Sequence, residues 1–311
     1  MTTFLVVGES LVDVVVPSDG SPRHDAVGGS CLNVAVGLAR LDVPTTLVTL
    51  LGDDALGRLC ADFVRASGVT LSEGSVVPGR TTSTATAHLD EQHSATYDFD
   101  LVWDLPAQEL PDDLLGIHVG SLGASLQPGR AAVVDLVRRA VEDDVFVSYD
   151  PNIRPAFLDD REAAWADVVE IARLARLVKL SDEDLRLLRP DTPEEDVCRE
   201  LLSGTDTELV ILTRGAEGAV AFTDGATLPV PAPPTDLVDS VGAGDSFMAA
   251  TLAMLCDWGV VADGEGAVRA LDDDRVRLLV RGAATAAAVT CSRRGANPPT
   301  RQDLPTTWPA G

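Results

Sequence analysis

A glycine-rich stretch at residues 239–247, Asp-Ser-Val-Gly-Ala-Gly-Asp-Ser-Phe, is the part of this sequence best suited to chemistry. Apolar residues recur at helical spacing after it, so Gly242, Ala243 and Gly244 are expected at the N-terminus of a helix. The first N–H groups of a helix have no intrahelical partner and carry partial positive charge, which favours a bound anion. Asp245 stands where a general base would act beside that anion. A capped helix behind a glycine-rich turn is the alternative.

This stretch resembles the signature of the ribokinase-like, or pfkB-type, carbohydrate kinases. The resemblance covers residues 8–298, with the other motifs in the family's order, and it is closest to the bacterial fructokinase branch. It implies that Asp245 is the catalytic base and that Gly242–Gly244 form the anion hole for the transferred phosphoryl group. It also implies that ATP and Mg²⁺ are the cofactors.

Two motifs near the start of the chain are expected to bind the sugar. Asp13 interrupts an apolar, β-branched run, and its carboxylate can accept hydrogen bonds from two vicinal hydroxyls. A strand-edge carboxylate facing water is the alternative for this residue. Gly28 and Gly29 open a helix where bare backbone can approach a ligand, and Asn33 on that helix offers a donor and an acceptor. The resemblance implies sugar contacts for Asp13, Gly29 and Asn33, and we expect Gly28 beside them.

A third motif, Asp-Pro-Asn-Ile-Arg at residues 150–154, follows an expected strand, and prolines at 151 and 155 hold it extended. Arg154 cannot lose its charge and suits bidentate contact with phosphate, while a plain surface arginine is the alternative. The motif resembles the fructokinase and ketodeoxygluconate-kinase branch of the family. We therefore expect Asn152 at the sugar and Arg154 at the reacting groups.

The motif that organises Mg²⁺ through water in the family, N-x-x-E, is altered here. This chain has Ser181 and Asp184 at the two positions, and serine at the first occurs in the fructokinase branch. Because aspartate is one methylene shorter than glutamate, the metal role is assigned jointly to Glu183 and Asp184. Lys179 and Ser181 are expected near the nucleotide. A serine-capped helix with acidic residues in its first turn is the alternative.

Two further segments are expected to bind the nucleotide. Residues 213–218 resemble the family's T-x-G-x-x-G loop, which implies nucleotide contacts for Thr213, Gly215 and Gly218, whereas a plain β-hairpin is the competing interpretation. Residues 282–288 form a helix of small side chains, which would leave a flat slot at Ala284 for adenine.

The resemblance also implies a monovalent cation, K⁺, beside the anion hole. Asp239 matches the family's aspartate at that site, and Val241 and the turn near Gly295 are the other candidate ligands.

These motifs follow strands in a repeated strand–helix pattern. Strands are expected at Thr3–Val7, Leu47–Leu51, Ile117–Val119, Val145–Tyr149, Leu177–Leu180, Leu209–Leu212 and Ala219–Thr223, with helices between them such as Ala131–Glu142 and Arg161–Leu174. Repeated βα units imply a mostly parallel sheet covered on both faces, with ligands at the carboxyl ends of its strands. Together with the resemblance, this predicts an α/β fold with a three-layer α/β/α core, in a single domain over residues 1–311.

A small β-sheet lid is expected from residues 11–27 and 81–104. Strand-forming residues at Thr81–Leu89 and Ala95–Phe99 flank a predicted turn at 90–93. In the family such strands cover the sugar and form a dimer interface, so a homodimer through the lid is expected. Phe99 would touch the sugar, or pack the lid against the core.

Composition excludes several other classes of protein. The 311 residues carry a net charge of −25, which argues against nucleic acid or an anionic membrane as a partner. There is no basic leader and no run of about 18 apolar residues. The five cysteines form no C-x-x-C pair, so reduced thiols in a cytoplasmic protein are expected.

The sequence therefore predicts ATP-dependent phosphorylation of a primary hydroxyl of a neutral sugar, with fructose as the best single guess. Residues 95–104 contain three aspartates and no arginine or lysine, so the carboxylate of 2-keto-3-deoxygluconate would meet repulsion there. A ketodeoxygluconate kinase, a ribokinase and a nucleoside kinase of the same fold remain alternatives. A catalytically inactive relative that senses sugar is the non-enzyme alternative.

Overall fold

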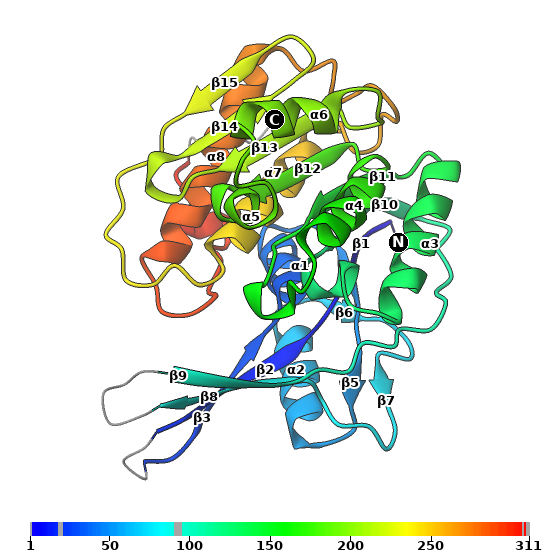
Figure 1. Ribbon diagram of the computed structural model, residues 1–311, viewed down its shortest axis with the longest axis vertical. Helices are drawn as coiled ribbons and strands as arrows, with labels where there is room; N and C mark the ends of the chain where they lie inside the picture. The colour runs from blue at the N-terminus through cyan, green and yellow to red at the C-terminus, as the bar shows by residue number, and fades with distance from the viewer. Residues whose placement is uncertain (1, 18–20, 90–94, 307, 309–311) are drawn as a thin grey trace.

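A nine-stranded sheet forms the centre of the molecule in the computed structural model, which describes residues 2–17, 21–89, 95–306 and 308 (Figure 1). Its strands are β1 (Thr3–Val7), β4 (Thr45–Val48), β6 (Thr70–Leu71), β10 (Leu114–Gly120), β11 (Phe146–Asp150), β12 (Leu177–Ser181), β13 (Leu209–Thr213), β14 (Ala219–Phe222) and β15 (Thr227–Val230). They lie in the order β15-β14-β13-β12-β11-β10-β1-β4-β6. All neighbours pair in parallel except β13–β14 and β14–β15, so the sheet is mostly parallel.

Helices cover both faces of this sheet. The α-helices are α1 (Ser30–Arg40), α2 (Ala55–Ala66), α3 (Gly129–Glu142), α4 (Arg161–Ala172), α5 (Asp182–Leu188), α6 (Glu194–Leu202), α7 (Ala243–Asp257) and α8 (Asp273–Cys291). Alternate residues of β1 show the two faces: Phe4 and Val6 lie in one core with α1, α7 and α8, while Leu5 and Val7 lie in the other with α3 to α6. The predicted three-layer α/β/α fold is confirmed.

A separate four-stranded sheet projects from the core (Figure 1). It consists of β2 (Leu11–Val16), β3 (His24–Gly28), β8 (Thr84–Leu89) and β9 (Ala95–Asp100) in the order β3-β2-β8-β9. Val12 and Val14 of β2 pack against Cys60 and Ala61 of α2, which ties this small sheet to the core. The predicted turn at 90–93 lies outside the described residues.

One strand prediction is wrong, because residues 47–51 do not form a single strand. β4 ends at Val48, and β5 (Leu51–Gly52) pairs with β7 (Val76–Val77) in a separate two-stranded sheet. Between them, the Thr49 hydroxyl donates to Ser10 Oγ, and its N–H donates to Ser75 Oγ. Side-chain partners thus replace the strand ladder at this point.

The remaining regular elements are short 3₁₀ helices, η1 (Ser121–Ala124), η2 (Pro155–Phe157), η3 (Gly215–Glu217) and η4 (Arg301–Asp303). Within the described part of the chain, no helix is both long and apolar enough to cross a lipid bilayer.

Helices α1 and α7 pack unusually closely, and a glycine permits it. A Cβ added at Gly37 of α1 would lie 2.6 Å from Cβ of Ala249 on α7. Any side chain at this position therefore forces the two helices apart or distorts them. Their N-termini carry the motifs described above, so this spacing bears on the site.

Gly37→Ala tests this constraint. Helix propensity alone would make alanine more stable than glycine by about 1 kcal/mol. We expect instead a loss of about 1–3 kcal/mol in the free energy of unfolding, measured by urea denaturation, because the added methyl overpacks the contact. Gly225→Ala is the control, since nothing lies within 4 Å of the added Cβ there. A stabilised Gly37→Ala variant would contradict the argument.

Candidate active site

The N-terminus of α7 forms the wall of a polar cavity of about 480 Å³ at the carboxyl ends of the parallel strands. Gly242 is the N-cap residue of α7, and its backbone lies in the left-handed region with φ 75°, where glycine is favoured. A Cβ at this residue would lie 2.7 Å from Cβ of Ala296, so no side chain fits. Ala243, Gly244 and Asp245 also line the cavity, as the sequence predicts for an anion site beside a carboxylate.

Asp245 is buried, and both of its carboxylate oxygens are held by side chains of α1. Ser30 Oγ donates to Asp245 Oδ1 at 2.6 Å, and Asn33 Nδ2 donates to Oδ2 at 2.8 Å. Asn152 Nδ2 in turn donates to Ser30 Oγ at 2.8 Å. The structure thus brings together three residues predicted from separate motifs, Asn33, Asn152 and Asp245, through Ser30, which the sequence analysis did not single out.

Glu9 anchors the start of α1 beneath this network. Its carboxylate accepts hydrogen bonds from the N–H of Ser30 at 3.1 Å and from the N–H of Gly123 at 2.8 Å. Burial raises the pKa of Glu9, and these N–H groups and the charge of Arg154 oppose that shift. A buried carboxylate therefore joins the segment after β1 to the starts of α1 and η1.

A buried ion pair lines the same polar cavity. Lys179 Nζ is 2.8 Å from Asp150 Oδ2, and both side chains are almost fully buried. Burial raises the pKa of Asp150 to about 6, although Lys179 acts in the opposite direction. Burial alone would lower the pKa of Lys179, but the carboxylates of Asp150, Asp184 and Asp245 outweigh it and raise that pKa. A Cβ at Gly244 would lie 3.5 Å from Nζ, so this ammonium sits directly beneath the anion site.

Arg154 is exposed and lines the polar cavity with Asp245. Its charge also reaches the small sheet: surrounding protein atoms raise the pKa of Asp13, and Arg154 opposes that shift. Its charge therefore acts on Asp13, and its side chain lines the cavity that Asp245 also lines.

The acidic residues after β12 have different surroundings. Asp184 is buried: its Oδ2 accepts from the N–H and hydroxyl of Ser181, and its Oδ1 accepts from the N–H of Ile153. The alternative of a serine-capped helix is thus confirmed, since Ser181 and Asp184 form a capping box at α5. Both Glu183 and Asp184 line the polar cavity, but only Glu183 is exposed. Its carboxylate can turn to a ligand, whereas both oxygens of Asp184 already accept hydrogen bonds.

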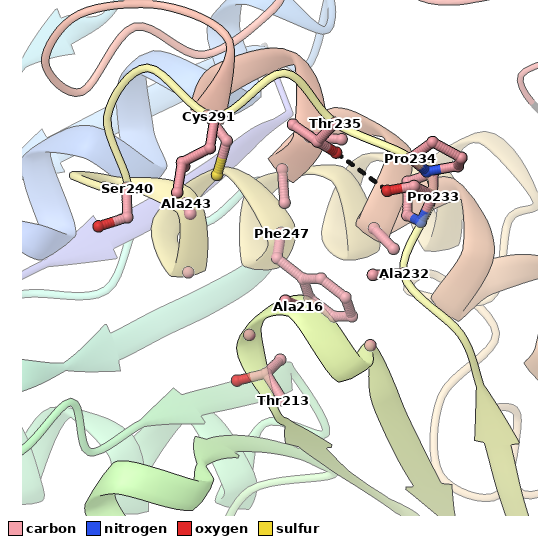
Figure 2. A pocket seen from close by; sticks show the side chains of 17 residues that line it. Thr213, Ala216, Ala232, Pro233, Pro234, Thr235, Ser240, Ala243, Phe247 and Cys291 are labelled. Carbon is pink, nitrogen blue, oxygen red and sulfur yellow. Dashed lines mark hydrogen bonds between the residues drawn. The ribbon is translucent and has the colours of Figure 1, made fainter.

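A second cavity of about 540 Å³, seen from close by in Figure 2, adjoins the first. Four of the six predicted nucleotide residues lie on its wall, namely Thr213, Gly215, Gly218 and Ala284, whereas Lys179 and Ser181 line the polar cavity. The other lining residues are mostly apolar: Ala216, Ala232, Pro233, Pro234, Leu237, Phe247, Ala287, Ala288 and Cys291. Thr213, Gly215, Ser240, Ala243 and Gly244 line both cavities. An apolar slot therefore opens onto the N-terminus of α7, which suits a planar base joined to phosphates.

The residues predicted to bind a monovalent cation also lie close together. The Asp239 carboxylate accepts from the N–H of Val241 at 3.0 Å and from the N–H of Gly295 at 2.8 Å, and these hydrogen bonds lower its pKa. Asp239 thus joins the loop before α7 to the turn after α8. The described residues contain no cluster of three histidine, cysteine or acidic side chains that could hold a metal ion. The cation site stays a prediction.

The remaining residues predicted to bind the sugar lie in or beside the small sheet. A Cβ at Gly28 would lie 2.5 Å from Asp13 Oδ2, so the glycine leaves room for that carboxylate. Gly29, with φ 116°, opens α1 in a conformation that favours glycine. The Phe99 ring lies edge-on against Phe157 of η2, with centroids 5.1 Å apart, and is 43% exposed. Phe99 therefore packs the small sheet against the core and still has surface available to a ligand.

Residues 1–303 match the pfkB family of carbohydrate kinases. This chain belongs to that family. A fructokinase of Rhizobium leguminosarum bv. trifolii is 31% identical over 262 residues, covering 81% of this chain and 79% of its own. The crystal structure of a Xylella fastidiosa fructokinase with bound ATP superposes with a TM-score of 0.79 at 25% identity, over 97% of this chain and 95% of that one. A Vibrio cholerae O395 fructokinase solved with fructose, ADP and calcium gives 0.78 at 25% identity, over 95% and 94%.

The buried ion pair supplies a test. Lys179→Met leaves the Asp150 carboxylate buried without its partner, so we expect a loss of about 3–5 kcal/mol in the free energy of unfolding at neutral pH. The loss should shrink as the pH falls, because Asp150 can then take up a proton. Urea denaturation at two pH values measures both effects. Lys179→Met combined with Asp150→Asn should recover most of the stability, and equal losses in the single and double variants would contradict this account.

Proposed function

We propose that this member of the pfkB family is a fructokinase, which transfers the γ-phosphoryl group of ATP to a primary hydroxyl of fructose. The observation that carries the proposal is the buried Asp245 carboxylate beside the bare N-terminus of α7, where an apolar cavity and a polar cavity meet. The fructokinases at about 30% identity, and the ATP-bound and fructose-bound structures named above, support the same activity. The whole chain would act as a single kinase domain.

In this mechanism the nucleotide lies across the junction of the two cavities. Adenine would occupy the apolar slot beside Ala284, and the Gly215 and Gly218 turn would admit the ribose and phosphates. The γ-phosphoryl group would then rest on the N–H groups of Ala243 and Gly244, which point to where negative charge develops. The fixed positive charge of Lys179 beneath them adds to the same field.

The sugar would lie between the small sheet and α1. Asp13, the backbone of Gly28 and Gly29, and Asn33 offer acceptors and donors for its hydroxyls, with Phe99 against an apolar face of the sugar. Asp245 would accept the proton of the primary hydroxyl as that oxygen attacks the γ-phosphorus, and Arg154 would hold the transferring oxygens.

The residues of the polar cavity fit a hydrated Mg²⁺ ion. Asp150 Oδ1 is buried without a hydrogen-bond partner, and Glu183 offers an exposed carboxylate in the same cavity. Oxygen ligands of this kind suit Mg²⁺, which keeps several of its waters. We assign the ion to Glu183 and Asp150, with Asp184 positioning the segment rather than meeting the ion. When bound, Mg²⁺ would neutralise charge on the phosphates.

A 2-keto-3-deoxygluconate kinase is the second candidate, and the position of Arg154 favours it. The charge of Arg154 acts on Asp13 in the small sheet, so the guanidinium can reach a sugar carboxylate as well as a phosphate. Against this candidate, residues 95–104 contain three aspartates and no arginine or lysine, although Arg80 pairs with one of the three, Asp104. We retain the neutral sugar as the substrate.

The finer points of the proposal concern cations, assembly and location. A K⁺ ion would lie beside the loops that Asp239 joins, since backbone carbonyls there face the anion site in the family.

A homodimer would form through the small sheet, whose outer strands β3 and β9 each pair on one side only within the described residues. Five free cysteines and the use of ATP favour the cytoplasm.

Asp245→Asn should lower kcat by roughly 10²–10⁴-fold, because the proposed base is removed. ATP binding should be retained, because the anion site at the N-terminus of α7 remains. A coupled ADP-release assay measures turnover, and calorimetry measures nucleotide affinity. Asp257→Asn is the matched control, because it makes the same change at the opposite end of α7, where Asp257 pairs with Arg301. Near-normal turnover by Asp245→Asn would remove Asp245 from the mechanism.

A panel of substrates separates the candidate sugars. We expect kcat/KM for fructose to exceed that for 2-keto-3-deoxygluconate by roughly tenfold or more, because the acid would meet the aspartates of the hairpin. Ribose and nucleosides in the same panel test the other kinases of this fold. A higher kcat/KM for the acid would overturn the choice of fructose, and Arg154→Met would then show whether Arg154 is its partner.

Replacing K⁺ by a bulky organic cation tests the monovalent site. Turnover should fall when the cation cannot coordinate carbonyl groups, and Asp239→Asn should weaken the dependence on K⁺. Equal rates in both salts would count against a functional site.

A further inference from the structure

We propose that Ser30 is a positioning residue for the catalytic base, an inference that rests on the proposed kinase function. Its hydroxyl holds the Asp245 carboxylate in one orientation. Ser30 is the first residue of α1, it is buried, and Oγ lies 2.6 Å from Asp245 Oδ1.

The direction of each hydrogen bond is fixed by the chemistry of the groups. The side-chain nitrogen of Asn152 can only donate, so Ser30 Oγ accepts from it at 2.8 Å. The single hydroxyl proton of Ser30 is therefore free to point at Asp245, whose ionised carboxylate can only accept. Asn152 therefore donates to Ser30, and Ser30 in turn donates to Asp245.

Both oxygens of the base are then constrained from the same helix. Asn33 Nδ2 holds Oδ2 at 2.8 Å, three residues after Ser30 on the same face of α1. Two donors on two oxygens oppose rotation of the carboxylate about its bond to Cβ. An oxygen directed at the substrate hydroxyl keeps its lone pair aligned for proton transfer, and small misplacements at this point are costly.

The backbone of Ser30 is fixed independently of its hydroxyl. Its N–H donates to Glu9 Oε1 at 3.1 Å, and Glu9 also holds Gly123 of η1. Removing the hydroxyl alone should therefore leave α1 in place and free only the carboxylate. This separates a positioning role from a role in folding.

Ser30→Ala should lower kcat by roughly 10- to 100-fold, with KM for fructose and for ATP changed by less than about threefold. Ser30→Cys keeps a weaker donor of similar size and should give an intermediate kcat. Ser121→Ala is the matched control, because Ser121 is also a buried serine at the first position of a helix, η1, and its hydroxyl has no hydrogen-bond partner among the described residues.

The decisive measurement is a double-mutant cycle with Asp245→Asn. A residue that acts through the base has no effect once the base is gone, so Ser30→Ala should leave the residual turnover of Asp245→Asn unchanged. Equal losses in both backgrounds, or an unchanged kcat in Ser30→Ala, would overturn the role. If the unmodified protein releases no ADP with any sugar, the kinase proposal itself fails, and the role of Ser30 fails with it.

Discussion

The close packing of α1 against α7 is the constraint on which the site depends. Each helix begins at the carboxyl edge of the sheet: α7 carries the bare N-terminus and Asp245, which we propose as the anion site and the base, and α1 carries Ser30 and Asn33, which donate to the Asp245 carboxylate. Gly37 facing Ala249 lets the two helices approach closely. Because their starting residues then lie within hydrogen-bond distance, Asp245 finds its partners in a segment more than 200 residues earlier in the chain.

Electrostatics explains how a chain with a net charge of −25 can receive a nucleotide. Its single lysine is buried beneath the anion site rather than spread over the surface, and Asp150 balances its charge. The other positively charged side chains that line the cavity are Arg154 and Arg214, of which Arg214 is paired with Glu194, and backbone N–H groups supply the rest. Local field, not overall charge, decides where an anion binds.

The fold and much of the site could be predicted because local patterns determine them. Apolar runs and glycine-rich turns place strands and helix starts, and parallel strands bring their carboxyl ends to one edge, where Asn33, Asn152 and Asp245 meet. Residues 47–51 could not be predicted, since the side chains of Ser10 and Ser75 interrupt the strand, and these lie far away in sequence. Ser30 was missed for the same reason. Its type and position look like an ordinary helix start, and only the hydrogen bond to Asp245 of α7 sets it apart.

The burial of the only lysine has a practical consequence for handling this protein. Lys179 is shielded by Asp150 and by the floor of the cavity, so a reagent that attacks free amines finds no accessible side chain in the folded state. Acylating dyes and amine-coupling supports would therefore leave this side chain unmodified while the fold is intact. Acylation of Lys179 would be detected by mass spectrometry once added denaturant opens its ion pair with Asp150. The extent of acylation would therefore report local unfolding at this site.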